Sequence, residues 1–223
     1  MNNILIIGDS FAADWTIKYP NEVGWPNLLA KEYNVVNLAQ AGVGEYKIYQ
    51  QLCSVNDIGK FDLVLISHTS PYRINTKRHP VHHNDPLHKN ADLIFSDIEY
   101  HKKSIFTWFN RSLITAFNFF IYHSDDKYLE TVYTLLRKQI NEMIGLTNLI
   151  VLTNFNVPEK FIIEENFLNF ENTQLTYPGL ANHMSDIGNK IVYDTLATRI
   201  KELGLKDFKN SKIEITTIKG DTK

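Results

Sequence analysis

The chain has 223 residues, of which 43% are hydrophobic and 22% are charged, and its formal net charge is −2. This length fits one domain with a sizeable core, and this composition excludes an intrinsically disordered chain. The slightly acidic balance argues against nucleic-acid binding, which usually requires a marked basic excess.

Four short apolar runs along the chain predict β-strands. Each run is nearly continuous in hydrophobic residues, as parallel strands are when both faces of their sheet are covered. The runs lie at residues 3–7, 34–39, 61–67 and 148–154.

Helical patterns fall between these strands. Pro26 suits the first turn of a helix, and residues 46–52 predict a second short helix. The clearest helix covers residues 127–144, where apolar side chains recur at steps of three and four. The last helix is expected from Ser185, a good N-cap residue, to about Leu203. This alternation of strands and helices predicts an α/β fold with a doubly wound parallel sheet.

Residues 71–126 break the alternation. They begin with PYRINTKRHPVHHNDPLHKN and continue into an aromatic-rich stretch, and they are too many for an ordinary loop. We therefore expect a single domain over residues 1–223, with a partly helical lid inserted at about 71–126. A second stretch, from about Pro158 to Pro178, is expected to be irregular.

The first predicted strand ends in Gly-Asp-Ser. Ligands of doubly wound sheets bind beyond the carboxyl ends of the strands, and Ser10 lies at such an end. A serine there serves as a helix cap, an anion ligand or a nucleophile. A nucleophile needs a base, and His183 from the last loop would reach the same edge with an unperturbed pKa of about 6.5.

Three segments together resemble the SGNH (GDSL-like) hydrolases, esterases and acyl-transfer enzymes with a flavodoxin-like sheet. These segments are IIGDSF at 6–11, NLAQAGVG at 37–44 and NHMSDIGNK at 182–190. The resemblance implies a three-layer α/β/α fold with Ser10 as nucleophile and His183 as base. It also implies an oxyanion hole built from the N–H groups of Ser10 and Gly42, with Gly44 as the alternative to Gly42.

Two departures from the family pattern concern the oxyanion hole and the catalytic acid. The family's third block usually ends in Gly-x-Asn-Asp, whereas this chain has Thr-Ser-Pro-Tyr-Arg, as some divergent members do, with Thr69 in place of the Asn. The Thr69 hydroxyl is expected to donate one hydrogen bond to the oxyanion. Leu180 stands where the family has its Asp. Asn182, Asp186 or a backbone carbonyl is left to orient the histidine, so a triad and a Ser–His dyad both stay open.

Four residues are candidates for contact with the substrate: Asp9, Ser70, Arg73 and Asn182. Arg73 follows the third strand and suits an anionic group such as a sugar carboxylate or a phosphate, although a solvated loop arginine is an equal alternative. Asp9 also fits a structural role within the turn.

The segment HPVHHNDPLH concentrates histidines in the predicted lid: His79, His82, His83 and His88, together with Asp85. Imidazoles and carboxylates are good zinc ligands. Their spacing matches no recognised metal motif, however, and the prolines indicate an irregular loop. We therefore expect no metal site and no cofactor.

The leading hypothesis is a serine esterase or acyl-transfer enzyme that acts on small acyl esters. The resemblance suggests O-acetyl groups on carbohydrate as its substrates. One alternative is a catalytically degenerate carbohydrate- or ligand-binding protein of the same fold. Another is a metal-dependent hydrolase that uses the loop at residues 79–88.

The sequence also bears on compartment and partners. Cys53 is the only cysteine, which excludes an intrachain disulfide and fits a reducing compartment. The first residues show no signal peptide, and no apolar run approaches the roughly 18 residues of a spanning helix. We expect a cytoplasmic protein with a small-molecule or carbohydrate ester as substrate and with no nucleic-acid or membrane partner. The sequence leaves the oligomeric state open.

Overall fold

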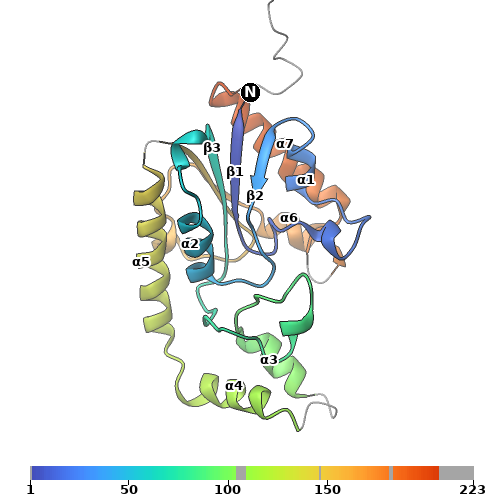
Figure 1. Ribbon diagram of the computed structural model, residues 1–223, viewed down its shortest axis with the longest axis vertical. Coiled ribbons are helices and arrows are strands. Elements are labelled where there is room, and N and C mark those ends of the chain that lie inside the picture. Colours follow the sequence, from blue (N-terminus) through green and yellow to red (C-terminus); the bar gives the residue numbers. More distant parts are fainter. Residues whose placement is uncertain (1, 104–108, 146, 181–182, 206–223) are drawn as a thin grey trace, which may run out of the picture.

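The computed structural model describes residues 2–103, 109–145, 147–180 and 183–205. In this part of the chain a five-stranded parallel sheet lies between two layers of helices (Figure 1), so the predicted α/β fold is confirmed. The strand order is β2-β1-β3-β4-β5, the flavodoxin-like order, and its switch point lies between β1 and β3. The strands are β1 (Asn3–Gly8), β2 (Asn34–Asn37), β3 (Leu63–His68), β4 (Asn148–Thr153) and β5 (Phe167–Asn169).

The alternation of side chains along β1 explains the two helical layers. Ile4 and Ile6 point to one face of the sheet, where they pack with helices α1 (Trp25–Leu29) and α7 (Asp186–Glu202). Leu5 and Ile7 point to the other face, against α2 (Glu45–Cys53) and α5 (Asp126–Ile144). All four β1 side chains are fully buried, which accounts for the continuous apolar run in the sequence.

The stretch expected to be irregular, at about 158–178, contains one strand. β5 is only three residues long and pairs in parallel with β4 through Val151–Phe167, Leu152–Leu168 and Thr153–Asn169. It lies at the edge of the sheet, so it needs no buried apolar run, and its three residues are too few to show an alternation. The same stretch holds helix α6 (Glu171–Thr176) and the 3₁₀ helix η5 (Glu159–Phe161).

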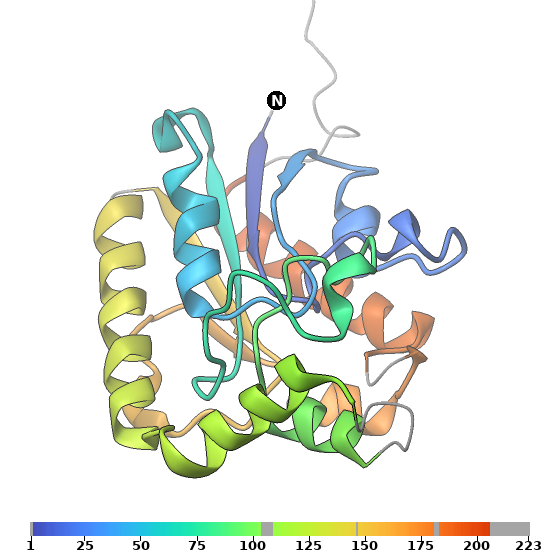
Figure 2. The same ribbon diagram turned by 60° about the horizontal axis from the view of Figure 1, so that its bottom comes forward.

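The described residues of the segment 71–126 lie at the carboxyl ends of the strands, as the two views of the fold show (Figures 1 and 2). Their described part contains the 3₁₀ helix η3 (His82–Asn84), α3 (Phe95–Lys102) and α4 (Arg111–Tyr122). Helices α3 and α4 pack on each other through Ile98, Leu113 and Ala116. Two further 3₁₀ helices lie elsewhere, η1 (Trp15–Ile17) and η2 (Ile58–Lys60).

Buried hydrogen bonds tie this segment to the rest of the fold. The fully buried Asp92 carboxylate accepts from the backbone N–H of Gly44 at 2.7 Å and of Thr76 at 2.8 Å. Lys47 of α2 lies 2.6 Å from the same carboxylate. These contacts to Asp92 fix the start of the segment beside the switch point of the sheet.

Across the described ranges, we find no helix with the length and apolar character that crossing a bilayer demands.

Candidate active site

The turn after β1 places Ser10 beside the switch point. β1 and β3 approach so closely at Gly8 that an added Cβ would lie 2.7 Å from both Cβ and O of Ser67, so glycine alone fits. Beyond it, the N–H of Asp9 donates to Ser67 O at 3.2 Å. The indole N–H of Trp15 donates to Ser10 O at 2.8 Å and fixes the next peptide.

Asp9 forms part of this turn. Its side chain is fully buried and accepts hydrogen bonds from the N–H of Phe11 at 3.1 Å and the hydroxyl of Ser67 at 3.0 Å. Burial raises the pKa of Asp9 to about 7, against the opposing effect of the Arg73 charge. Asp9 is not among the residues that line the cleft around Ser10, and its contact with substrate stays a prediction.

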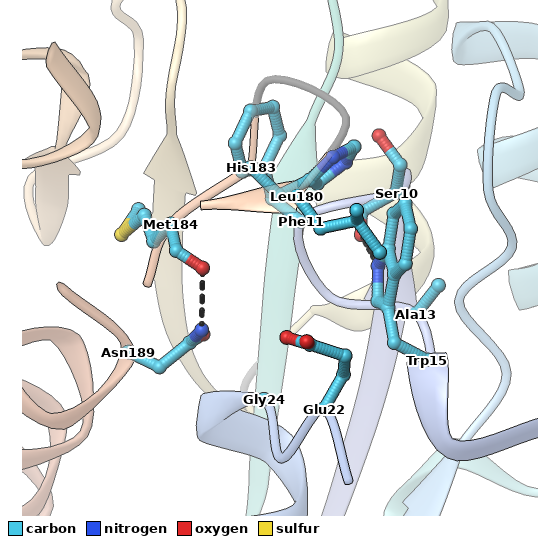
Figure 3. Close-up of a pocket in the computed structure, with 10 residues that line it drawn as sticks. All are labelled: Ser10, Phe11, Ala13, Trp15, Glu22, Gly24, Leu180, His183, Met184 and Asn189. Carbon is cyan, nitrogen blue, oxygen red and sulfur yellow. Dashed lines mark hydrogen bonds between the residues drawn. The ribbon is translucent and has the colours of Figure 1, made fainter. Parts of the chain in front are cut away.

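The fold brings His183 to Ser10 from the far end of the sequence. Both residues line a cleft of about 780 Å³ and also a small pocket beside it (Figure 3). The imidazole packs against the rings of Trp15, with centroids 4.2 Å apart, and Phe11, at 4.6 Å. Aromatic contacts of this kind restrict the position of the ring. The predicted nucleophile and base therefore share one cleft.

The loop that carries His183 is held from both sides. The carbonyl of His183 accepts from Gly179 N–H at 2.6 Å. Met184 O accepts from the Asn189 side chain at 3.1 Å (Figure 3). A Cβ on Gly188 would lie 2.8 Å from the Met184 Cβ, so a glycine is needed for α7 to approach this loop. These contacts set where the imidazole enters the cleft.

Two backbone N–H groups are available to receive negative charge. Within the described residues, we see no acceptor for the N–H of Ser10 or for that of Gly42, and both residues line the cleft. Gly42 has a φ of +78°, and its carbonyl turns away to accept from Asp92 N–H at 2.9 Å and Arg73 Nη1 at 3.0 Å. The alternative donor, Gly44, already donates to Asp92. The geometry therefore favours Gly42 over Gly44.

Thr69, directly after β3, contacts Arg73 at the cleft. The Thr69 side chain is fully buried and is not among the residues that line the cleft, and its contact with the oxyanion stays a prediction. Its Oγ1 accepts from Nε of Arg73 at 2.9 Å. Arg73 does line the cleft, held by Thr69 and by the Gly42 carbonyl. Thr69 thus positions a guanidinium beside the two free N–H groups.

The other predicted contacts lie elsewhere. Ser70 lines a neighbouring cavity of about 360 Å³ next to α5, which shares Arg73 with the cleft, and its contact with substrate stays a prediction. Asn182 lies outside the residues that the structure describes. Asp186 is exposed in the first turn of α7, and Leu180 is 42% exposed with its carbonyl accepting from His183 N–H at 2.9 Å.

The structure adds one carboxylate that the sequence did not suggest. Glu22 lines the small pocket of about 30 Å³ together with Ser10 and His183, and its carboxylate points into this pocket (Figure 3). Glu22 comes from the loop before α1 and belongs to no motif. Only the tertiary packing of that loop against the start of α7 brings it to the site.

Comparison with known proteins gives limited information. No known protein family and no curated protein sequence matches the chain. Among solved structures it is similar to the lipase/acylhydrolase from Enterococcus faecalis, at 12% identity and a TM-score of 0.48 over 91% of this chain and 97% of that chain. It is also similar to the acetyl xylan esterase AlAXEase, at 14% identity and a TM-score of 0.37 over 89% of this chain and 99% of that chain. Likenesses this distant carry no argument about chemistry, which rests on the residues of the site.

Proposed function

We propose that the protein is a serine esterase or acyl-transfer enzyme acting on small acyl esters. One observation carries the proposal: Ser10 and His183, from opposite ends of the chain, line the same cleft at the switch point of the sheet. A serine hydroxyl becomes a nucleophile when a nearby base accepts its proton, and imidazole is the base best suited to neutral pH.

The reaction follows in two halves. Ser10 Oγ attacks the ester carbonyl while His183 takes the hydroxyl proton, and the imidazolium then gives this proton to the leaving alkoxide. Water or an acceptor hydroxyl next attacks the acyl-enzyme, with His183 again acting as base and then returning the proton to Ser10. The first acceptor gives hydrolysis and the second gives acyl transfer.

The negative charge that develops on the carbonyl oxygen is received by the N–H groups of Ser10 and Gly42. Each such donor typically contributes a factor of about 10² to 10³ to kcat. Arg73, fixed on Thr69 and on the Gly42 carbonyl, adds a positive charge at the same side of the cleft. This guanidinium compensates for the amide donor that the family's usual asparagine provides.

Glu22 is our candidate for the group that orients the imidazole. The pocket that it shares with His183 has a volume of about 30 Å³. The centre of a water molecule needs roughly 10–15 Å³, so this pocket beside the carboxylate and the imidazole has room for water. A carboxylate acting in this way stabilises the imidazolium that forms during the reaction.

The cleft suits a leaving group rich in hydroxyls. Beyond Ser10 it is lined by polar side chains such as Ser96 and Gln174 and by the exposed ring of Tyr100. Polar groups that bind hydroxyls and an aromatic face that packs on a sugar ring are both available there. O-acetyl groups on carbohydrate are therefore the substrate class that we favour.

Ester hydrolysis by purified variants tests the proposal. We expect wild type to hydrolyse p-nitrophenyl acetate faster than the butyrate and octanoate esters, and to release acetate from acetylated oligosaccharides. Ser10→Ala and His183→Ala should each lose at least 100-fold in kcat, because each removes one half of the nucleophile–base pair. Ser112→Ala, on the exposed face of α4, should keep the wild-type rate. Undiminished hydrolysis by Ser10→Ala would contradict the proposal.

A further inference from the structure

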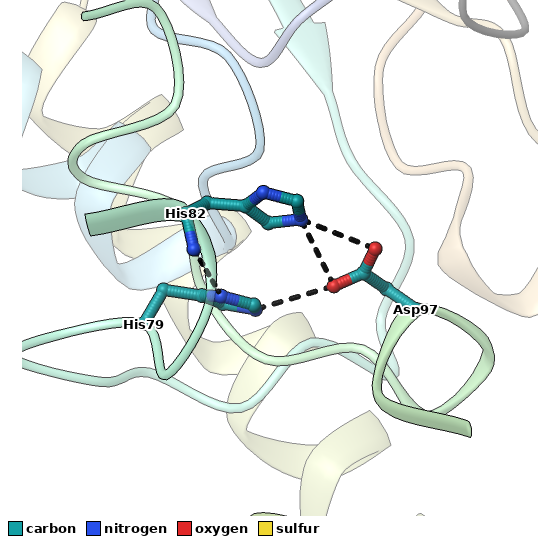
Figure 4. Close-up of side chains that lie close together, drawn as sticks. All are labelled: His79, His82 and Asp97. Carbon is teal, nitrogen blue, oxygen red and sulfur yellow. Dashed lines mark hydrogen bonds and ion pairs between the residues drawn. The ribbon is translucent and has the colours of Figure 1, made fainter. Parts of the chain in front are cut away.

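The cleft contains a second cluster of side chains that the proposed reaction does not use. His79 and His82, from the loop around η3, meet Asp97 of α3, and one ligand atom of each lies within 4.8 Å of the others (Figure 4). His79 is 1% exposed, the other two are half-buried, and all three line the cleft. We infer that this cluster binds a divalent transition-metal ion of the zinc class.

The distances within the cluster lie at the long end of the hydrogen-bond range and also suit a shared ion. Two ligand atoms about 2.0–2.1 Å from zinc at a tetrahedral angle lie about 3.3 Å apart. The Nε2 atoms of His79 and His82 lie 3.4 Å and 3.2 Å from Oδ2 of Asp97. By contrast, the buried His68–Glu45 pair of the same protein, a true imidazole–carboxylate hydrogen bond, closes to 2.6 Å.

The donor set is one that zinc commonly accepts. Two imidazoles and one carboxylate form a three-ligand site, which leaves a fourth position for water or a substrate oxygen. The three residues line the same cleft as Ser10, so a substrate in this cleft has access to the ion. A sugar hydroxyl or carboxylate oxygen is the ligand chemistry that such a position would take.

His101 supports the carboxylate from its other side. It follows Asp97 by one turn of α3, and its Nε2 lies 3.5 Å from Oδ1 of Asp97. Its ring packs edge-on against that of His82, with centroids 5.2 Å apart. Second partners of this kind fix the orientation of a ligating carboxylate.

Two local hydrogen bonds oppose metal binding and provide a signature for it. Nδ1 of His79 accepts the backbone N–H groups of Val81 at 3.2 Å and His82 at 3.1 Å. A metal on Nε2 requires the imidazole proton to sit on Nδ1, so both contacts must be given up. The rearrangement is confined to the turn before η3. Metal binding should therefore accelerate hydrogen exchange of these two amides.

The spacing of the histidines in the sequence could not reveal this site. The loop supplies only two of the three ligands, and Asp97 comes from a helix beyond it. The inference does not depend on Ser10 being a nucleophile, because the ion is held by residues that take no part in the proposed acyl transfer.

Calorimetric titration of the full chain, purified without a histidine tag and stripped with chelator, tests the inference. Zn²⁺ should bind with one equivalent, and Co²⁺ should give the intense visible absorption of a tetrahedral site. Asp97→Asn and His82→Ala, both at partly exposed positions, should weaken binding at least 10-fold. His123→Ala, at an exposed histidine after α4, should not.

Further outcomes separate this inference from the proposed function. Ser10→Ala should bind Zn²⁺ as tightly as wild type, whether or not the protein is an esterase. Circular dichroism of each variant establishes that it is folded. Absence of stoichiometric Zn²⁺ binding to folded wild type would overturn the inference, as would equal binding by Asp97→Asn and His123→Ala. Unchanged exchange of the Val81 and His82 amides on adding Zn²⁺ would exclude His79 from the ligand set proposed here.

Discussion

Gly42 offers the sharpest test of how the backbone forms the proposed oxyanion hole. In Gly42→Ala the new Cβ would lie 2.7 Å from the Cβ of Ala91. The alanine would also have to adopt a φ of +78°. A left-handed conformation costs an L-residue about 1–2 kcal/mol. Overpacking against Ala91 adds about 1–3 kcal/mol. We therefore expect the free energy of unfolding to fall by about 2–5 kcal/mol.

A matched glycine separates these two contributions. Gly204 has almost the same φ, +77°, but no atom lies within 4 Å of an added Cβ. Gly204→Ala should therefore show the conformational cost alone, about 1–2 kcal/mol. In the double variant Gly42→Ala/Ala91→Gly the nearest neighbour becomes the Ala91 Cα position at 3.3 Å, so part of the lost stability should return.

Urea unfolding and steady-state hydrolysis of p-nitrophenyl acetate measure the two consequences. If the Gly42 N–H receives the oxyanion, its displacement should lower kcat by 10-fold or more while KM changes little. Gly204→Ala should keep the wild-type kcat. Equal stability of the two single variants would refute the packing argument. A wild-type kcat in Gly42→Ala would refute the assignment of its N–H.

Three further changes test other parts of the account. The raised pKa of Asp9, about 7 against 3.8, means that the folded chain holds this proton more firmly than the unfolded chain, so stability falls as pH rises between these values. In urea unfolding of wild type, the free energy of unfolding should decrease by about 2–3 kcal/mol from pH 5 to pH 8. Asp9→Asn should lack this decrease. Glu22→Gln should lower kcat at least 10-fold without a matching rise in KM, because the imidazolium loses its counter-charge; an unchanged kcat would exclude Glu22 as the orienting group. Arg73→Lys keeps the charge but loses the paired contacts to Thr69 and the Gly42 carbonyl, so kcat should fall about 10-fold or more. A wild-type rate would show that these two guanidinium contacts are not needed.

Those parts of the fold that depend on local pattern were predictable from the sequence. β1, β3 and β4 appear as continuous apolar runs because helices cover both faces of the sheet, whereas β2, a four-residue edge strand, is only partly buried. The long amphipathic helix predicted at 127–144 is α5, Asp126–Ile144. β5 escaped prediction because three residues at a sheet edge need no apolar run.

Some residues of the candidate site were predictable from the sequence, and others depend on tertiary packing. Ser10 was suggested by its place at the end of a strand and His183 by its place in the last loop, whereas the role of Gly42 was implied only by the family resemblance of residues 37–44. Glu22 and Asp97 come from a loop and a helix whose approach to that edge depends on tertiary packing. The burial of Thr69 beneath Arg73 is likewise a result of packing, which no spacing along the chain encodes.

Intact-mass analysis after incubation with a fluorophosphonate tests the central claim most directly. We predict a single adduct on wild type that maps to Ser10, with none on the exposed Ser112, because accessibility without a base does not activate a hydroxyl. The adduct should disappear in Ser10→Ala and form at least 100-fold more slowly in His183→Ala. A folded wild-type protein that forms no adduct, or one that labels equally fast without His183, would contradict the claim that this cleft holds an activated serine.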